Sequence, residues 1–237
     1  MLQMGRQREY IKTGKTPSED VTNMVVEMDE ATREQVREMF ENLVNEVTIH
    51  LFTESEKCLY CNDTRDLVQL VAELSDLIKV EEHQGPLDGT LAKRLGVKRH
   101  PAIVLHGKDE YKVKFYGIPA GHEFGALIGD IVDVSNGAVP LPPDIIEDIR
   151  AIDEPIHIRV FVTPQCPYCP GMTRLAHQAA ILNPLIDSEM YESLEMQEDA
   201  AKFEVFGVPK TIFNDTVTVE GLTPPEMFVE KLYEAIE

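Results

Sequence analysis

Four cysteines are the residues in this sequence best suited to carry chemistry, because they form two Cys-x-x-Cys pairs with none left over: Cys58 with Cys61, and Cys166 with Cys169. Two thiols at that spacing can close a disulfide and reopen it. Each pair follows an apolar run, residues 47–52 and 156–162, and precedes a segment with helical periodicity. This order predicts that the first cysteine lies at the exposed start of a helix and the second lies one turn behind it.

The position at a helix start assigns a role to each cysteine. The thiolate is the nucleophile, and the partial positive charge and free N–H groups of a helix N-terminus lower a thiol pKa from about 8.5. We therefore assign attack on a substrate disulfide to Cys58 or Cys166, and resolution of the mixed disulfide to Cys61 or Cys169. Pro167 suits the first helical turn, where its missing N–H would have no partner.

The two pairs differ in the charges beside them. Glu54 and Glu56 flank the first pair and oppose a thiolate, while Lys57 offsets part of their effect; residues 163–165 carry no charge. The sequence therefore predicts that Cys166 has the lower thiol pKa and turns over substrate faster.

Structural zinc is the main alternative for the cysteines, because four thiolates satisfy its tetrahedral geometry. Zinc ribbons space their pairs by about 15–20 residues, whereas these pairs are a whole domain apart and each follows a strand. Buried inert thiols are a third interpretation. The histidines other than His100 show no ligand spacing, so the sequence predicts no metal site; they are His50, His83, His106, His122, His157 and His177.

The sequence contains an internal repeat. Cys58 and Cys166 are 108 residues apart (166 − 58), and so are Pro101 and Pro209 (209 − 101), each of which leads directly into an apolar strand. A shared register at such chemically unusual positions predicts two similar domains.

The residues around each X-Pro bond are candidate substrate contacts. We expect Pro101 and Pro209 to be cis and to face the cysteines, so that the backbone of His100 or Val208 is presented to a bound peptide; the alternative is a proline that merely begins a strand. Tyr60 and Tyr168, between the cysteines, are expected in an apolar rim, although each could be merely an exposed ring. His100 is a candidate for substrate contact, and lone histidines are more often structural.

Composition bounds the remaining possibilities. The chain has 237 residues, 43% of them hydrophobic, and a formal net charge of −20, which argues against nucleic acid or an anionic membrane as partner. It has no apolar run long enough for a membrane span and no signal-peptide pattern, so we expect a cytoplasmic protein.

The domain boundaries follow from a polar stretch at the N-terminus and a proline-rich stretch in the middle of the chain. Residues 1–27 form a polar N-terminal extension, residues 28–138 the first domain, 139–143 a proline-rich linker and 144–237 the second domain. Asp29 is expected to cap the first helix, and the apolar positions from Leu67 to Ile78 predict one amphipathic helix.

The repeat, the two Cys-x-x-Cys pairs and the two X-Pro strand starts resemble the thioredoxin superfamily. More closely, residues 28–237 resemble the protein disulfide oxidoreductases of thermophilic archaea and bacteria, with Cys-Pro-Tyr-Cys at 166–169 and the variant Cys-Leu-Tyr-Cys at 58–61. The resemblance implies an α/β protein of two tandem thioredoxin folds, each a central mixed sheet flanked by helices. It also implies that the four cysteines are the redox centres and that the two prolines are cis.

The activity that the resemblance implies is reduction, oxidation and isomerisation of protein disulfides by dithiol–disulfide exchange. It needs no organic cofactor, and a thioredoxin reductase-type flavoprotein is the expected electron source. A rival role is an electron carrier between a flavin disulfide reductase and a peroxidase; another is a non-catalytic peptide-binding or metal-binding scaffold. Residues 1–27 lie outside the resemblance and are a candidate for self-association into a homo-oligomer.

The sequence departs from the thioredoxin pattern in three ways. It has no Trp, and Lys57 and Gln165 precede the first cysteines. The buried acid expected six residues before each first cysteine is replaced by Phe52 and Val160, so the proton acceptor for the resolving thiol must come from elsewhere. The glutathione-binding Thr-Val-Pro and Gly-Gly motifs are absent, which argues against direct use of glutathione.

Overall fold

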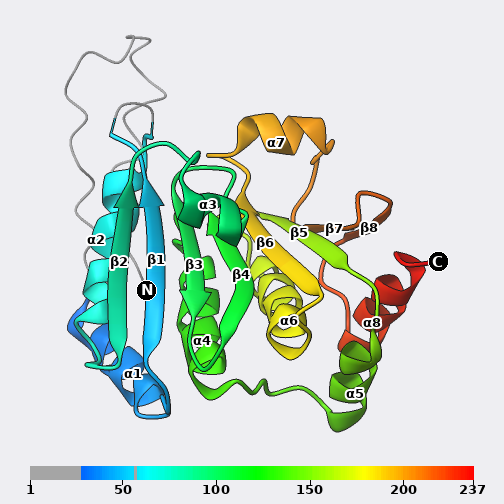
Figure 1. Ribbon diagram of the computed structural model, residues 1–237, viewed down its shortest axis with the longest axis horizontal. Coiled ribbons are helices and arrows are strands. Elements are labelled where there is room, and N and C mark those ends of the chain that lie inside the picture. The colour runs from blue at the N-terminus through cyan, green and yellow to red at the C-terminus, as the bar shows by residue number, and fades with distance from the viewer. Residues whose placement is uncertain (1–27, 56–57) are drawn as a thin grey trace.

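The computed structural model describes residues 28–55 and 58–237, which form one eight-stranded sheet with helices on both faces (Figure 1). The first half of the chain contains α1 (Glu30–Phe40), β1 (Val47–Thr53), α2 (Cys61–Ala72), β2 (Ile78–Gln84), α3 (Thr90–Leu95), β3 (Ala102–His106), β4 (Glu110–Tyr116) and α4 (Glu123–Asn136). The second half contains α5 (Pro143–Ala151), β5 (Ile156–Val162), α6 (Cys169–Leu182), β6 (Ile186–Glu192), α7 (Gln197–Lys202), β7 (Lys210–Phe213), β8 (Val217–Glu220) and α8 (Pro225–Glu234).

The two halves have the same strand order and pairing, as the repeat predicts. The sheet runs β2-β1-β3-β4-β6-β5-β7-β8. Within the first half, β1 is parallel to β2 and antiparallel to β3, and β3 is antiparallel to β4. The strands β5 to β8 repeat this arrangement. The chain is therefore two tandem thioredoxin folds, each with a mixed sheet.

The two four-stranded sheets join edge to edge, which the sequence did not predict. Strand β4 pairs in parallel with β6, from Val113 opposite Ser188 to Tyr116 opposite Tyr191. Following the pairings across the sheet, β1 and β5 run in the same direction. The two Cys-x-x-Cys pairs come directly after these strands. Both pairs therefore lie beyond the carboxyl ends of β1 and β5, which we call the cysteine edge of one continuous sheet.

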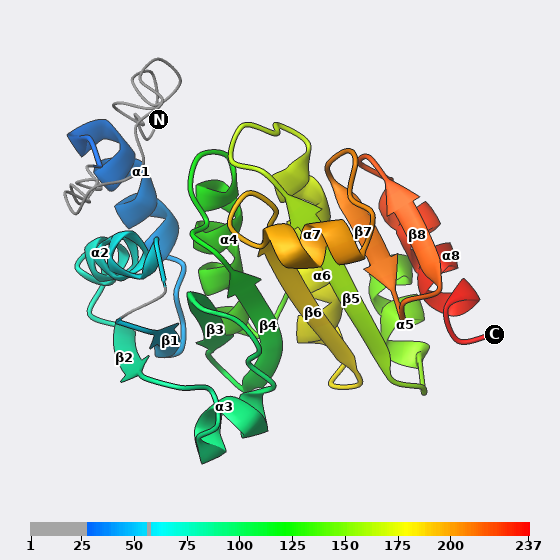
Figure 2. The same ribbon diagram turned by 90° about the horizontal axis from the view of Figure 1, so that it is seen from above.

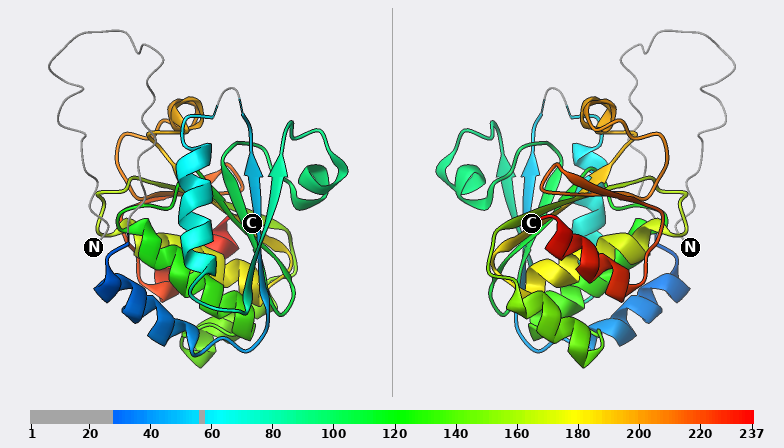
Figure 3. Two further views of the ribbon diagram at one scale, coloured as in Figure 1. Left: turned by 90° about the vertical axis from the view of Figure 1, so that its left-hand side faces the viewer. Right: turned by 90° about the vertical axis from the view of Figure 1, so that its right-hand side faces the viewer.

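The helices divide unequally between the two faces of the sheet. Helices α1, α2, α4, α5, α6 and α8 cover one face, and α3 and α7 lie on the other (Figures 2 and 3). The larger core runs through both halves under the six helices, whereas the smaller one is rich in aromatic side chains, including Phe52, Tyr116, Phe161 and Tyr191. One continuous core thus supports both halves.

Buried polar contacts between α4 and α6 also hold the halves together. The fully buried carboxylate of Asp130 accepts a hydrogen bond from Arg174 at 2.7 Å and contacts Nδ1 of His177 at 2.6 Å. One turn later, Asp133 pairs with Arg174 at 2.8 Å and accepts from Gln178 at 3.1 Å. Because a buried charge is costly unless it is paired, these contacts fix the register of the two helices. The helices run side by side, and both begin at the cysteine edge.

The predicted first helix is confirmed, but the extent of the second is wrong. Asp29 caps α1 by accepting a hydrogen bond from the Thr32 N–H at 2.8 Å. Helix α2 ends at Ala72 rather than continuing through Ile78. Ile78 instead begins β2 and pairs with Val47, because the β1–β2 ladder satisfies its backbone groups. Apolar residues in the turn between α2 and β2 had continued the helical spacing by coincidence.

Some expectations fall outside the part of the chain that the structure describes: the N-terminal extension 1–27, and the charges of Glu56 and Lys57 beside the first pair. Among the described residues, none of the helices combines the length and apolar character needed to cross a bilayer.

Candidate functional site

Each Cys-x-x-Cys pair forms a disulfide at the start of a helix. The Cα atoms are 5.4 Å apart in Cys58–Cys61 and 5.5 Å apart in Cys166–Cys169, a usual separation for a disulfide. The helices α2 and α6 begin at the second cysteine of each pair. Both pairs are therefore closed at an ordinary backbone separation.

The predicted exposure of the second pair is wrong in detail. Cys166 is only 8% exposed, because it lies before the helix, in a turn where its N–H donates to the Thr163 carbonyl at 3.1 Å. Pro167 also lies before the helix, and the proline in the first turn is Pro170. Cys169 is fully buried. Residues 167 and 168, between the two cysteines, are exposed.

Both X-Pro bonds are cis, as predicted. The Val208 carbonyl oxygen, just before Pro209, lies 3.8 Å from the sulfur of Cys166. In the first half, Ala102 follows the cis Pro101 and pairs with Phe52 near the end of β1. Each cis-proline thus begins a strand at the cysteine edge.

Apolar side chains are exposed beside both pairs. Tyr168 is 63% exposed and Leu59, between the first two cysteines, is 64% exposed. Phe206, two residues before Val208, is 92% exposed, and sequence reasoning missed it. The only signal was an aromatic residue just ahead of an X-Pro strand. Tyr60 is half-buried, and its carbonyl accepts from the Thr64 hydroxyl at 2.7 Å. Exposed apolar side chains of this kind are candidates for contact with a partner protein.

His100 belongs to the first site. Its Nδ1 lies 3.6 Å from a carboxylate oxygen of Glu54, the residue that follows β1. Burial lowers the pKa of His100, and the Glu54 carboxylate opposes that change. The backbone N–H of Glu54 donates to the sulfur of Cys61 at 3.3 Å. Through Glu54, the structure connects His100 to Cys61.

The backbone donors differ between the two pairs. The Cys169 N–H donates to the sulfur of Cys166, the residue to which the sequence assigns attack, at 3.1 Å. The donor described at the first pair points instead to Cys61, the resolving residue. A hydrogen bond to a thiolate favours the charged form. This difference supports the predicted order of acidity, with Cys166 above Cys58.

We therefore expect Cys166 to react faster than Cys58 at pH 6–7, because more of it is thiolate. Iodoacetamide alkylation of the reduced protein across pH, read residue by residue by mass spectrometry, measures both titrations. Denatured protein, in which the two thiols have no folded environment, is the control. Equal midpoints, or a lower midpoint for Cys58, would contradict the prediction.

A buried carboxyl group lies at the start of α4, close to the loop that leads to the second pair. Glu123, the first residue of α4, is 1% exposed, and neither carboxyl oxygen has a hydrogen-bond partner of normal geometry among the described residues. The preceding His122 donates its N–H to the Pro164 carbonyl at 3.0 Å, which ties the start of α4 to the loop before Cys166. Burial raises the pKa of Glu123 to about 8, and the nearby Thr173 hydroxyl, one turn after Cys169, opposes that rise. Glu123 thus lies near Thr173 of α6, at a helix start that contacts the loop before Cys166.

Sequence reasoning missed Glu123 for a physical reason. The positions six residues before the first cysteines hold Phe52 and Val160, which are buried. An acidic residue in the first turn of a helix is ordinarily solvated and interacts favourably with the helix dipole. Nothing in the sequence therefore marked Glu123 as a buried residue. Its burial depends on the packing of α4 against α6.

A second, half-buried acid comes from the second half of the chain and lies near α2, the helix that begins at the first pair. Glu195, after β6, accepts the Ile118 N–H at 2.8 Å, and burial raises its pKa to about 8. Asp63, in the first turn of α2, is close enough to add to that rise. Each half therefore places an acidic residue near the first turn that follows the other half's cysteines.

Comparison with known proteins places this geometry in a family. A family model described as a thioredoxin domain matches residues 156–234. The solved structure of a protein disulfide oxidoreductase from Aeropyrum pernix K1 is 30% identical, with a TM-score of 0.82, covering 89% of this chain and 94% of that one. The F subunit of the alkylhydroperoxide reductase of Enterococcus faecalis, at 23% identity and a TM-score of 0.81 over 86% of this chain and 99% of that one, shares the fold.

Curated sequences include more distant relatives. The F subunit of the alkyl hydroperoxide reductase of Staphylococcus epidermidis is 28% identical over 140 residues, which is 59% of this chain and 25% of the relative. The chain thus spans about a quarter of the length of that relative. The identity and coverage shared with the Aeropyrum pernix protein, together with the two Cys-x-x-Cys sites, show that the chain belongs to the protein disulfide oxidoreductase family of thioredoxin-fold thiol–disulfide oxidoreductases.

Proposed function

We propose that this protein reduces, oxidises and isomerises disulfides of other proteins, using both Cys-x-x-Cys pairs. The observation that carries the proposal is the presence of two closed pairs, with a cis-proline strand beside each, at one edge of a continuous sheet. We assign one pair to each of two domains, residues 28–138 and 144–237, joined by the linker 139–143. Because the sheet fixes the two sites relative to each other, both can act on one substrate.

In the reductive direction the exchange proceeds in two steps. The thiolate of Cys166 attacks one sulfur of the substrate disulfide, a mixed disulfide forms, and one substrate sulfur leaves as thiolate. Cys169 then loses its proton and attacks the Cys166 sulfur, which releases the second substrate thiolate. Two electrons pass to the substrate, and the protein is left with the Cys166–Cys169 disulfide. Cys58 and Cys61 perform the same steps at the first site.

The substrate is proposed to bind as an extended peptide. The carbonyl of Val208, 3.8 Å from the Cys166 sulfur, faces the reacting atoms and can accept an N–H from the peptide backbone. Pro209 fixes that carbonyl, while Tyr168 and Pro167 form the apolar approach. His100, Pro101 and Tyr60 have the corresponding places at the first site. Such backbone pairing accommodates many sequences, as a general disulfide oxidoreductase requires.

We assign Glu123 as the proton acceptor for Cys169. The carboxyl group is buried near the first turn of α6, where bulk water cannot take the thiol proton directly. A pKa of about 8 is close to that of a thiol, about 8.5, which favours rapid proton transfer in both directions. We assign the corresponding role at the first site to Glu195, through Asp63.

Electrons for reduction are proposed to come from a thioredoxin reductase-type flavoprotein, since the disulfides themselves are the redox centres and need no organic cofactor. A second candidate function is electron transfer to a peroxide-reducing enzyme. Its support is the similarity to the F subunits of alkyl hydroperoxide reductases. In that role one pair would receive electrons and pass them to a dedicated partner.

Two double variants test the proposal: Cys58→Ser/Cys61→Ser and Cys166→Ser/Cys169→Ser. Each is assayed for reduction of insulin disulfides with dithiothreitol and for reactivation of a scrambled disulfide protein. We expect each variant to retain part of the reductase activity and both to lose more isomerase than reductase activity. Redox equilibration of each variant gives its potential; values near −180 mV indicate an isomerase or oxidant, and values near −270 mV a thioredoxin-like reductant.

The result that would overturn the proposal is an absence of reversible disulfide formation in both variants, with activity unchanged when all four cysteines are serine. That outcome would favour the scaffold. The carrier role would be established by two results together. The wild-type protein would act on neither insulin nor the scrambled substrate, and it would still transfer electrons from a flavoprotein reductase to a peroxidase.

A further inference from the structure

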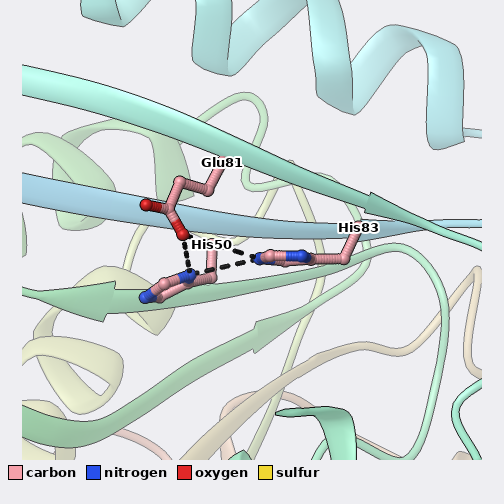
Figure 4. A group of neighbouring side chains, drawn as sticks. All are labelled: His50, Glu81 and His83. Atoms are coloured by element: carbon pink, nitrogen blue, oxygen red, sulfur yellow. Dashed lines mark hydrogen bonds and ion pairs between the residues drawn. The ribbon is translucent and has the colours of Figure 1, made fainter. Parts of the chain in front are cut away.

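Three histidines and a glutamate meet on the α3 face of the sheet, at its β2 end. His50 lies on β1, and its neighbour in the parallel ladder of β1 and β2 is Glu81. His83 lies two residues further along β2, so its side chain is on the same face as that of Glu81. Figure 4 shows the three side chains turned toward one another. His106 on β3 contacts His50 from the other side.

The spacing of the three side chains in Figure 4 fits a small metal ion. Nδ1 of His50 lies 3.2 Å from Nε2 of His83 and 3.3 Å from Oε2 of Glu81, and the last two atoms are 4.0 Å apart. A tetrahedral Zn²⁺ with ligands at 2.0–2.1 Å holds them about 3.3 Å from one another. The three ligand atoms thus need little movement to close around one ion.

His106 completes the arrangement. Its Nδ1 lies 3.1 Å from Nε2 of His50. If His50 donates that N–H, its Nδ1 has a free lone pair directed at Glu81 and His83. Metal-binding histidines usually donate their second N–H to such a fixed acceptor, which sets the tautomer and orientation of the ring.

A second group of similar composition differs in that its carboxylates are already paired with cations. His157, Asp187 and Glu189 also have ligand atoms close together. Lys114 pairs with Asp187 and lies 4.0 Å from Glu189, and the ammonium group of Lys98 is 3.0 Å from Glu189. These cations already neutralise the carboxylates. No Lys or Arg forms an ion pair with Glu81 in the described part of the chain, so its charge remains available for a cation.

We propose that His50, Glu81 and His83 form a binding site for a borderline divalent transition-metal ion, Zn²⁺ in particular, with His106 orienting His50. Two imidazoles and a carboxylate exclude Mg²⁺ and Ca²⁺, which require oxygen ligands. The side chain of Glu81 is 58% exposed and that of His50 is 10% exposed, so the ion enters from the solvent side and water takes the fourth position. The bound ion would link the edge strand β2 to β1.

The test uses the full chain in its oxidised form, because both disulfides then keep the four cysteines from binding metal. The protein carries no histidine tag, since the tag would bind metal itself. Cobalt(II) is the probe. We expect one equivalent to bind, with the visible d–d bands of tetrahedral cobalt and no sulfur-to-metal charge-transfer band. Competition by Zn²⁺ gives the affinity for zinc. Glu81→Gln and His83→Gln should each weaken binding at least about tenfold, and His106→Leu should weaken it about 10- to 100-fold through His50.

Two matched variants control for the loss of a charge or a histidine. Glu82→Gln removes the adjacent acid, which pairs with Arg65 on the other face of the sheet, and His122→Gln removes an exposed histidine. Both should bind Co²⁺ as the wild type does. Because the Glu81 side chain is exposed, its substitution leaves the fold intact, and far-ultraviolet circular dichroism verifies this. Absence of binding up to about 0.1 mM Co²⁺ or Zn²⁺, or equal binding by Glu81→Gln and His83→Gln, would overturn the site.

Discussion

Replacing Cys169 with serine in a Cys58→Ser/Cys61→Ser background is expected to leave Cys166 covalently attached to its protein substrate. Attack by Cys166 still forms the mixed disulfide, but no thiol at 5.5 Å Cα separation remains to resolve it. Well-oriented intramolecular groups act at effective concentrations of about 10⁵ M or more, so turnover should fall by at least about 10³-fold. Non-reducing electrophoresis and mass spectrometry measure the trapped complex.

The complementary variant distinguishes the two cysteines. Cys166→Ser in the same background should form no complex, because Cys169 is fully buried and cannot reach an external disulfide. The trapped complex should disappear on addition of dithiothreitol. Trapping by Cys166→Ser, with none by Cys169→Ser, would reverse the assignment of attacking and resolving residues.

Replacing Glu123 with glutamine is expected to slow resolution at the second site by about 100-fold or more, the usual contribution of a general base. Glutamine keeps the size of the side chain but cannot accept the Cys169 proton. Single-turnover reduction of a fluorescent disulfide substrate, followed across pH, measures the rate. The wild-type rate should rise as Glu123 ionises near pH 8, and the variant should lack that step.

The same substitution should change the pH dependence of stability. Glu123 has a pKa of about 8 in the folded protein and 4.5 as its ordinary value, so its protonated form favours the fold. The stabilisation is complete below pH 4.5 and is lost as pH rises through 8. One pKa unit corresponds to 1.36 kcal/mol. Between pH 4 and pH 9, the free energy of unfolding of Glu123→Gln should therefore rise by roughly 3–5 kcal/mol relative to that of the wild type. Urea unfolding at both pH values measures the difference.

Glu195→Gln is the matched control for both effects. Glu195 is half-buried and also has a pKa of about 8, but it lies near Asp63 of α2, on the side of the first pair. It should show the same pH dependence of stability while leaving single turnover at Cys166 unchanged. If Glu123→Gln altered neither the pH–rate profile nor the pH dependence of unfolding, Glu123 would not be the proton acceptor.

Local patterns predicted most of the fold. The 108-residue shift shared by the cysteines and the X-Pro bonds depends only on spacing, and the strand after each cis-proline is a short apolar run. Residues such as Cys166 and Pro209 carry their chemistry in their own side chains, so residue type and position were enough to make them candidates. The error at the end of α2 arose because Ile78 fits a helical stripe as well as a strand, and only its pairing with Val47 decides between them.

The remaining features depend on contacts between distant segments. Strand β4 pairs with β6, and the residue pattern of a single strand does not reveal which strand will be its neighbour. Glu123 becomes buried because α6 packs against α4, and His50 meets Glu81 and His83 because β1 and β2 are neighbours in one particular register. A one-residue slip in that register would turn the histidine away from the glutamate.

The edge-to-edge joining of the two sheets has a consequence for assembly. In the repeat, β8 corresponds to β4 and β2 corresponds to β6, and within the described residues β2 and β8 end the sheet. The contact inside the molecule is head-to-tail, and such a contact has no geometric reason to stop after two units. The β2 end carries the exposed acid Glu81, and the four-residue β8 ends in the exposed Glu220. Repulsion between these acids, in a chain of net charge −20, opposes the growth of one molecule's sheet into the next and so works against fibre formation.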